Sequence, residues 1–239
     1  MKIVAIIPAR AGSRSIKNKN LIQIKNKPLI YYSINSAKKS NLINRIIVST
    51  DSKKIKEVAK SYGAEVPFLR PRKISGFLSR DIEYLKHCIN FLKKESYIPD
   101  LIVLLRPTTP FRETKIIDKA IKLVIKNKSD SLRSVSVAKE TPYKMWKKKG
   151  KFILPFFGFK KIDKTNYPRQ KLDKFYWQNG YVDIIKPSTI KKYKNELGKK
   201  ILFYEIKSNI FEIDYKYQLK FVNKFYQNYK IVERDLYPS

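Results

Sequence analysis

Apolar residues along the chain form short continuous runs that alternate with longer amphipathic segments. The runs lie at 2–8, 45–50, 100–105 and 132–138, and the amphipathic segments lie at 28–39, 52–62, 79–95 and 114–127. A continuous apolar run of this length is typical of a strand buried on both faces, and apolar positions three and four residues apart are typical of a helix. The alternation predicts an α/β fold, Rossmann-like and doubly wound, with a mostly parallel sheet whose ligands bind at the carboxyl ends of the strands.

Several predicted helices begin at residues that suit a first turn. Pro28 stands at the start of the first helix, Ser52 follows Asp51 at the start of the second, and Ser79 is a possible cap of the third. We expect the Asp51 carboxylate to cap the second helix, which ends at Gly63.

The regular alternation stops between residues 139 and 178, where the chain is rich in aromatic residues, Pro and Lys. Because long loops without a function are uncommon in compact domains, we interpret 139–178 as a β-rich arm inserted in a single domain that spans 1–239. Its aromatic residues favour packing on a second subunit in a homodimer, and a long surface loop is the alternative. Strands at 180–185 and 200–206 and an amphipathic helix after Asp214 complete the predicted fold.

The composition indicates a folded chain and excludes two kinds of site. The 239 residues are 43% hydrophobic and 13% aromatic, which is enough for a packed core. Cys88 is the only cysteine and His87 the only histidine, so the sequence offers neither a disulfide framework nor a zinc cluster. The apolar run 3–8 is too short for a signal peptide, and no segment is long enough to span a membrane. We therefore expect a cytoplasmic protein without a membrane partner.

The formal net charge of +33 raises the possibility of a nucleic-acid-binding protein. Of the 53 basic residues, 11 are Arg and the remaining 42 are Lys, which are spread evenly along the chain. An even spread of Lys is typical of a solvated surface, so a nucleic-acid partner is the weakest interpretation. The Arg residues fall mostly in predicted loops, where their planar guanidinium groups suit phosphate and carboxylate ligands.

The loop at 9–20, ARAGSRSIKNKN, follows the first predicted strand and carries a dense group of cations. It contains a single glycine, Gly12, and matches neither the P-loop pattern nor the dinucleotide-binding pattern. Anion binding would therefore depend on side chains, and such a density suits a triphosphate. Those side chains are Arg10, Ser13, Arg14, Lys17 and Lys19. The alternative is a basic surface loop without a ligand.

A family resemblance runs over nearly the whole chain. The stretches that carry it are IIPARAGSRSIKNKNL, KPLIYYSI, RIIVSTDS, YGAEVPFLRP and LLRPTTPFR, followed by PYKMW, NYPRQ, YWQNG and EID. In this order they resemble the acylneuraminate cytidylyltransferases, and the KNKN stretch favours that branch over the octulosonate cytidylyltransferases. The resemblance implies that CTP reacts with a 2-keto-3-deoxy sugar acid to give a CMP-sugar and pyrophosphate. It also implies Mg²⁺ as the cofactor and a homodimer.

The resemblance further implies roles for individual residues. The implied catalytic residues are Arg10, Arg14 and Lys19, and the implied nucleotide contacts are Ala9, Arg10, Ser13, Arg14, Asn20, Arg70 and Ser79. The implied sugar contacts are Arg106, Lys144, Arg169, Gln178 and Asn179, and the implied Mg²⁺ ligands are Glu212 and Asp214. For Ser79 a plain helix cap is equally open, and for the acidic pair a solvated pair is the alternative.

This chain departs from the family pattern at three places. Arg106 stands where the family has Gln, Trp177 stands where it has Arg, and Glu212 stands where it has Asp. The first two positions touch the sugar in the resembled enzymes, so the identity of the sugar acid stays open, and an octulosonate or another sugar nucleotidyltransferase is the runner-up. A surface ion pair is the alternative role for Arg106. In an extended segment, residues 212 and 214 would point to one side, as shared Mg²⁺ ligands would require.

Overall fold

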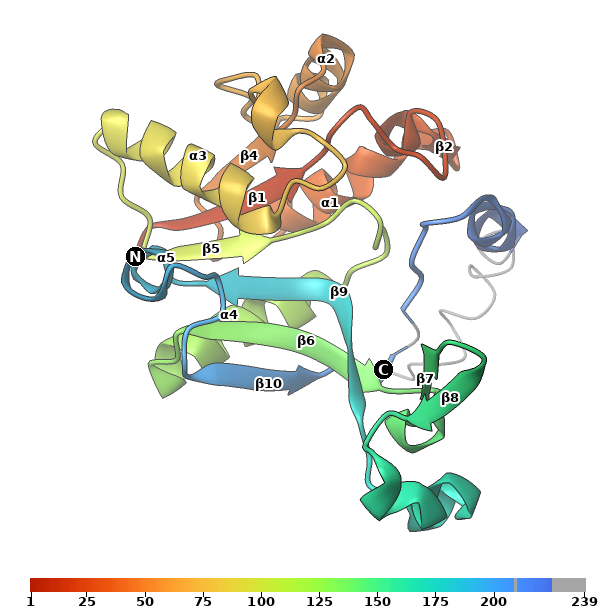
Figure 1. The fold of residues 1–239 in the computed structure, drawn as a ribbon. Helices are drawn as coiled ribbons and strands as arrows, with labels where there is room; N and C mark the ends of the chain where they lie inside the picture. Colours follow the sequence, from red (N-terminus) through yellow and green to blue (C-terminus); the bar gives the residue numbers. More distant parts are fainter. Residues whose placement is uncertain (209, 225–239) are drawn as a thin grey trace, which may run out of the picture.

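The computed structural model describes residues 1–208 and 210–224, and its centre is a six-stranded sheet (Figure 1). The strand order is β10-β6-β9-β5-β1-β4. The strands are β1 (Ile3–Pro8), β4 (Arg45–Ser49), β5 (Leu101–Leu104), β6 (Ser131–Val137), β9 (Tyr176–Ile185) and β10 (Ile201–Glu205). β1 pairs in parallel with β4 and β5, and β10 pairs in parallel with β6. The predicted α/β fold with a mostly parallel sheet is confirmed.

Strand β9 runs antiparallel between β5 and β6, which the sequence pattern did not reveal. The sequence predicted a strand at 180–185, and the structure extends it back to Tyr176. Because β9 runs in the opposite direction, its first residues lie at the edge where the parallel strands end. Gln178 and Asn179 are thereby brought to the edge where β6 ends, which is where ligands of α/β sheets usually bind.

Helices cover both faces of the sheet. They are α1 (Leu29–Lys38), α2 (Lys53–Ser61), α3 (Asp81–Lys94), α4 (Thr114–Asn127) and α5 (Pro187–Tyr193). The first, second and fourth pack into one apolar cluster with the sheet, and α3 and α5 pack into the cluster on the opposite face. The short helix α5 was not predicted. The N-cap residue of α3 is Arg80, so the alternative that Ser79 caps this helix is wrong.

The continuous apolar runs are explained by burial of the strands on both faces. In β1, Ile3 and Ala5 belong to one buried cluster, and Val4 and Ile6 belong to the other. Successive side chains of a strand point to opposite faces, so a strand between two helix layers needs apolar residues at every position.

Residues 139–175 leave the sheet and project beyond the start of β9 (Figure 1), whereas 176–178, which were predicted as the end of the arm, belong to β9 and pair with β6. The arm holds the hairpin of β7 (Trp146–Lys149) and β8 (Phe152–Pro155), together with short 3-10 turns at Pro142–Lys144, Phe159–Asn166 and Arg169–Lys171. Trp146, Phe152 and Phe159 are exposed in this chain.

A small ribbon of β2 (Gln23–Ile24) and β3 (Lys27–Pro28) follows a 3-10 turn at Lys19–Leu21. A second 3-10 turn, Arg72–Ile74, lies between α2 and α3. The helix predicted after Asp214 is seen at 216–224, and residues 225–239 lie outside the described part of the chain. Among the described helices, none combines the length and the apolar character needed to cross a membrane.

Candidate active site

A cavity of about 430 Å³ opens at the carboxyl ends of β1 and β5. Its lining residues are Pro8, Arg10, Ser13, Arg14, Ser15, Lys19, Asn20, Phe77, Asp81, Arg106, Pro107, Thr108, Asp214 and Tyr215. The cations Arg10, Arg14, Lys19 and Arg106 outnumber the two carboxylates, and we call this space the cationic cavity. It gathers residues that lie about 200 positions apart in the sequence, and such a cluster of cations suits a polyanionic ligand.

The loop 9–20 is held over the sheet by backbone contacts. The Asp51 carboxylate accepts a hydrogen bond from the Ala11 N–H at 2.8 Å, and the Ala9 N–H donates to the Ser49 carbonyl at 2.9 Å. The expectation that Asp51 caps α2 is wrong, because the Ser52 hydroxyl accepts the capping hydrogen bond from the Ile55 N–H at 3.3 Å. Asp51 instead fixes the cationic loop, a role that the sequence analysis missed.

Lys19 and Asp214 join the loop to the segment near the C-terminal helix. The Lys19 ammonium lies 2.6 Å from the Asp214 carboxylate. The segment is anchored because the Ile213 N–H donates to the Thr108 carbonyl at 2.8 Å and the Ile213 side chain is buried. The pKa of Glu212 is raised, first by burial and then by the negative charge of Asp214.

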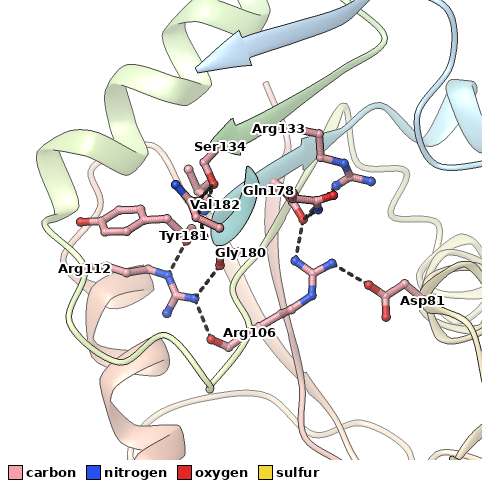
Figure 2. Close-up of polar contacts among 11 residues, drawn as sticks. Asp81, Arg106, Arg112, Arg133, Ser134, Gln178, Gly180, Tyr181 and Val182 are labelled. Atoms are coloured by element: carbon pink, nitrogen blue, oxygen red, sulfur yellow. Dashed lines mark hydrogen bonds and ion pairs between the residues drawn. The ribbon is translucent and has the colours of Figure 1, made fainter. Parts of the chain in front are cut away.

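Arg106 lies at the centre of an ion-pair network next to the cationic cavity (Figure 2). Its guanidinium donates to the Asp183 carboxylate at 2.5 Å and to the Asp81 carboxylate at 2.6 Å. Arg133 lies 2.9 Å from the same Asp183 oxygen, and the Gln178 amide donates to that oxygen at 3.3 Å. Burial alone would lower the pKa of Arg106, but the charges of Asp183 and Asp81 outweigh burial and raise it.

Arg112 holds the loop after β5 in place from inside the protein. Its guanidinium is buried and donates to the backbone carbonyls of Arg106 at 2.6 Å, Tyr181 at 2.5 Å and Gly180 at 3.3 Å (Figure 2). It also donates to the backbone carbonyl of Thr109. Burial lowers the pKa of Arg112. Arg112 therefore joins the loop after β5 to β9 through hydrogen bonds to backbone carbonyls. Arg106, in contrast, binds carboxylate side chains.

A second cavity of about 780 Å³ lies where β6 and β10 end and the arm begins, and we call it the arm cavity. Its lining residues are Ser136, Val137, Ala138, Lys139, Glu140, Met145, Trp177, Asn179, Glu205, Ile206, Lys207, Ser208, Ile210, Glu212 and Gln218. Asn179 is fixed there, because its amide oxygen accepts from the Ser134 hydroxyl at 2.7 Å and its amide nitrogen donates to the Ser136 hydroxyl at 2.9 Å. Glu212 lines this cavity and Asp214 lines the cationic cavity, so the segment between them connects the two.

Some residues implied by the resemblance lie outside both cavities. Ala9 is fully buried. Arg70 is also buried, and its guanidinium donates to the Ser49 carbonyl at 2.6 Å while burial lowers its pKa. Ser79 lines a neighbouring pocket that shares Arg14 and Phe77 with the cationic cavity. Their contacts with a nucleotide stay predictions.

The remaining sugar candidates also lie away from the cavity walls. Lys144 lies in the arm, in the turn Pro142–Lys144. Arg169 donates to the carbonyl of Ala138 at 2.8 Å, and Ala138 itself lines the arm cavity. Gln178 contacts the Asp183 carboxylate instead of either cavity. Their contacts with a sugar stay predictions.

Comparison with known proteins adds a family match and several relatives. A family described as cytidylyltransferase matches residues 4–154. The N-acylneuraminate cytidylyltransferase of Escherichia coli O18:K1:H7 is 40% identical over 123 residues, which are 51% of this chain and 28% of that protein. The post-translational flagellin modification protein B of Campylobacter coli is 31% identical over 229 residues, which are 92% of this chain and 93% of that protein.

The first curated relatives are matched over only 28% to 57% of their own length, so this chain spans about half of those proteins or less. Among solved structures, the CMP:2-keto-3-deoxy-manno-octonic acid synthetase in complex with CTP has a TM-score of 0.70 and 14% sequence identity. The match covers 95% of this chain and 99% of that chain. At this level of identity the likeness shows a shared fold.

Proposed function

The chain belongs to the cytidylyltransferase family, and we propose that it transfers the cytidylyl group of CTP to a 2-keto-3-deoxy sugar acid of the nonulosonate class. The observation that carries this proposal is the cationic cavity, which sets Arg10, Arg14 and Lys19 around one space at the carboxyl ends of β1 and β5. A triphosphate needs several cations at one place, and a loop with a single glycine can supply them only through side chains.

In the proposed reaction, the anomeric hydroxyl oxygen of the sugar acid attacks the α-phosphorus of CTP. A new O–P bond forms, the bond between the α-phosphorus and the bridging oxygen breaks, pyrophosphate leaves, and the hydroxyl proton passes to solvent. Little covalent chemistry is required of the protein, so catalysis depends on placing the two substrates and on neutralising charge. Arg10, Arg14 and Lys19 hold the triphosphate and stabilise the charge that develops on pyrophosphate.

The arm cavity is the place proposed for the sugar acid. It adjoins the cationic cavity through Glu212 and Asp214, so a sugar bound there could reach a phosphate bound in the other cavity. Asn179 offers an amide fixed by two hydroxyl groups in the arm cavity, and Arg106 offers a cation in the wall of the cationic cavity. Lys144, Arg169 and Gln178 remain proposed contacts at the edge of this region.

Glu212 and Asp214 are the residues proposed to hold Mg²⁺. Carboxylate oxygens are the hard ligands that this ion prefers. Burial, and after it the negative charge of Asp214, raises the pKa of Glu212, and a bound cation would favour the ionised form of both carboxyl groups. No group of three or more His, Cys, Asp or Glu side chains suited to a metal occurs in 1–208 and 210–224, so phosphate oxygens and water would complete the coordination. When bound, Mg²⁺ supplies positive charge to the leaving pyrophosphate.

We also propose that the protein is cytoplasmic and forms a homodimer through the arm. The arm exposes Trp146, Phe152, Ile153 and Phe159, which is a large apolar surface for a solvated hairpin. Static light scattering is expected to give twice the chain mass of 28.2 kDa. A monomer with full activity would contradict this part of the proposal.

The test of the proposed function is pyrophosphate release with Mg²⁺ and each of the four common nucleoside triphosphates. The acceptors are neuraminate, legionaminate, pseudaminate and octulosonate. Turnover with CTP and a nonulosonate is expected. Turnover with another nucleotide, or with octulosonate alone, would move the chain to a different sugar nucleotidyltransferase class, and absence of turnover with every pair would reject the proposal. An Arg14→Gln variant is expected to raise the KM for CTP at least tenfold.

A further inference from the structure

Phe77 connects two cations of the loop 9–20 to a segment that is distant in sequence. The guanidinium carbon of Arg14 lies 3.9 Å from the centre of the Phe77 ring, and that of Arg10 lies 5.7 Å from it. The neighbouring backbone takes part, because Arg10 donates to the carbonyl of Gly76 at 2.8 Å. Phe77 is 55% exposed and lines the cationic cavity, so packing in the core does not explain its position.

Two of the four cations around the cationic cavity are paired with carboxylates, and the other two have different partners. Lys19 is paired with the Asp214 carboxylate and Arg106 with those of Asp81 and Asp183. Within the described part of the chain, no carboxylate forms an ion pair with Arg10 or Arg14. Their close partners are the Phe77 ring and a backbone carbonyl.

An aromatic ring and a carboxylate hold a guanidinium with different consequences for a ligand. A carboxylate orients the cation but cancels its charge, so an incoming phosphate must displace it or accept a weaker attraction. The face of an aromatic ring attracts a cation through its quadrupole and carries no net charge. Two arginines held by one ring therefore keep both of their positive charges for a polyanion, although the two guanidinium groups repel each other.

We propose that Phe77 is a positioning residue for the triphosphate, which holds Arg14 and Arg10 in the cationic cavity with their charges free for phosphate. This inference rests on the proposed function only in identifying the triphosphate as that of CTP. Phe77 acts through Arg14, the nearer of the two guanidinium groups. Without the ring the Arg14 side chain is mobile, and it must lose conformational freedom when the triphosphate binds, which weakens binding.

The experiment is titration calorimetry of the full chain with inorganic tripolyphosphate, which has no base or sugar, followed by CTP. Phe77→Ala is compared with Phe77→Tyr, which retains the ring, and with Leu78→Ala, a matched control at an adjacent side chain that is 86% exposed. Phe77→Ala is expected to weaken binding of both ligands by about 2- to 30-fold, the range of a cation–π contact. The other two variants are expected to stay within about twofold of the unchanged protein.

A double variant separates positioning from a general effect on structure. If Phe77 acts through Arg14, Phe77→Ala loses its effect on tripolyphosphate binding when it is combined with Arg14→Gln. The proposal is overturned if Phe77→Ala binds like Leu78→Ala, if it binds more tightly than the unchanged protein, if the two effects add in full, or if the unchanged protein does not bind tripolyphosphate. A preference for another nucleotide over CTP would instead contradict the proposed function and leave the role of Phe77 in place.

Discussion

Replacing Asp183 by Asn is expected to destabilise the protein more than any other single change to the Arg106 network. Asp183 is fully buried, and one of its carboxylate oxygens receives contacts from Arg106 at 2.5 Å and from Arg133 at 2.9 Å. Asn keeps the size of the side chain and removes the charge. Arg133 then loses the only ion pair that it makes among the described residues, and its side chain is only 10% exposed.

The magnitude follows from the burial of the pair. Removing one partner of a buried ion pair costs about 3–5 kcal/mol, because the other charge stays buried without compensation. A domain of this size is stable by about 5–15 kcal/mol and loses about 2–4 °C of Tm per kcal/mol, so Asp183→Asn should lower Tm by about 6–20 °C. Asp81→Asn removes a carboxylate from the same Arg106, but the Asp81 side chain is 37% exposed, and this change should cost at most about 1 kcal/mol.

Thermal and urea unfolding of the two variants, followed by circular dichroism, measure this difference directly. Asp81→Asn is the matched control, since both variants convert a carboxylate bound to Arg106 into an amide. Adding Arg133→Met to Asp183→Asn should recover part of the lost stability, because it removes the charge that was left unpaired. Equal losses from Asp81→Asn and Asp183→Asn, or a further loss in the double variant, would refute the reasoning from burial.

Three other outcomes are expected. Removal of Mg²⁺ with EDTA should abolish pyrophosphate release, excess Mg²⁺ should restore it, and Asp214→Asn should shift the Mg²⁺ concentration for half-maximal rate upward at least tenfold; activity in EDTA would contradict the metal site. Burial raises the pKa of Cys88 to about 12, so a thiol reagent at pH 8 should label no cysteine in the folded protein and one per chain in guanidinium. Ser52→Ala should lower the free energy of unfolding by about 0.5–2 kcal/mol through loss of the α2 cap, whereas Ser61→Ala at the end of that helix should change it by less than about 0.5 kcal/mol; equal effects would contradict the capping role.

The parallel part of the sheet could be predicted because its strands are buried on both faces. In β1 and β5 every residue is apolar, which is the pattern of a short strand packed between two helix layers. Strand β9 could not be placed in the same way. Its first part, with Tyr176 and Gln178, is exposed, and strand direction leaves no mark in a pattern of apolar residues.

The place of the loop 9–20 at a cavity could be predicted because its cations follow a buried strand, where ligands of α/β sheets bind, and its role in anion binding stays a prediction. The contacts that hold the loop could not be identified, since they depend on which strands are neighbours. Asp51 illustrates the limit: a local rule favours an Asp near a helix start as a cap, but the pairing of β1 with β4 brings its carboxylate to the Ala11 N–H. The neighbouring Ser52 caps the helix instead, because its hydroxyl accepts a hydrogen bond from the Ile55 N–H.

The cations give the cationic cavity its positive charge, but carboxylates fix the positions of two of them, Lys19 and Arg106. The chain has 20 acidic residues against 53 basic ones, so the carboxylates are too few to pair one to one with the cations. Asp183 and Asp81 fix Arg106, and Asp214 is paired with Lys19. A carboxylate placed beside Arg14 would have fixed it equally well but at the expense of its attraction for phosphate. The position of the acids therefore distinguishes Lys19 and Arg106, whose charges carboxylates partly offset, from Arg10 and Arg14, whose charges no carboxylate among the described residues offsets, and only the folded arrangement reveals that difference.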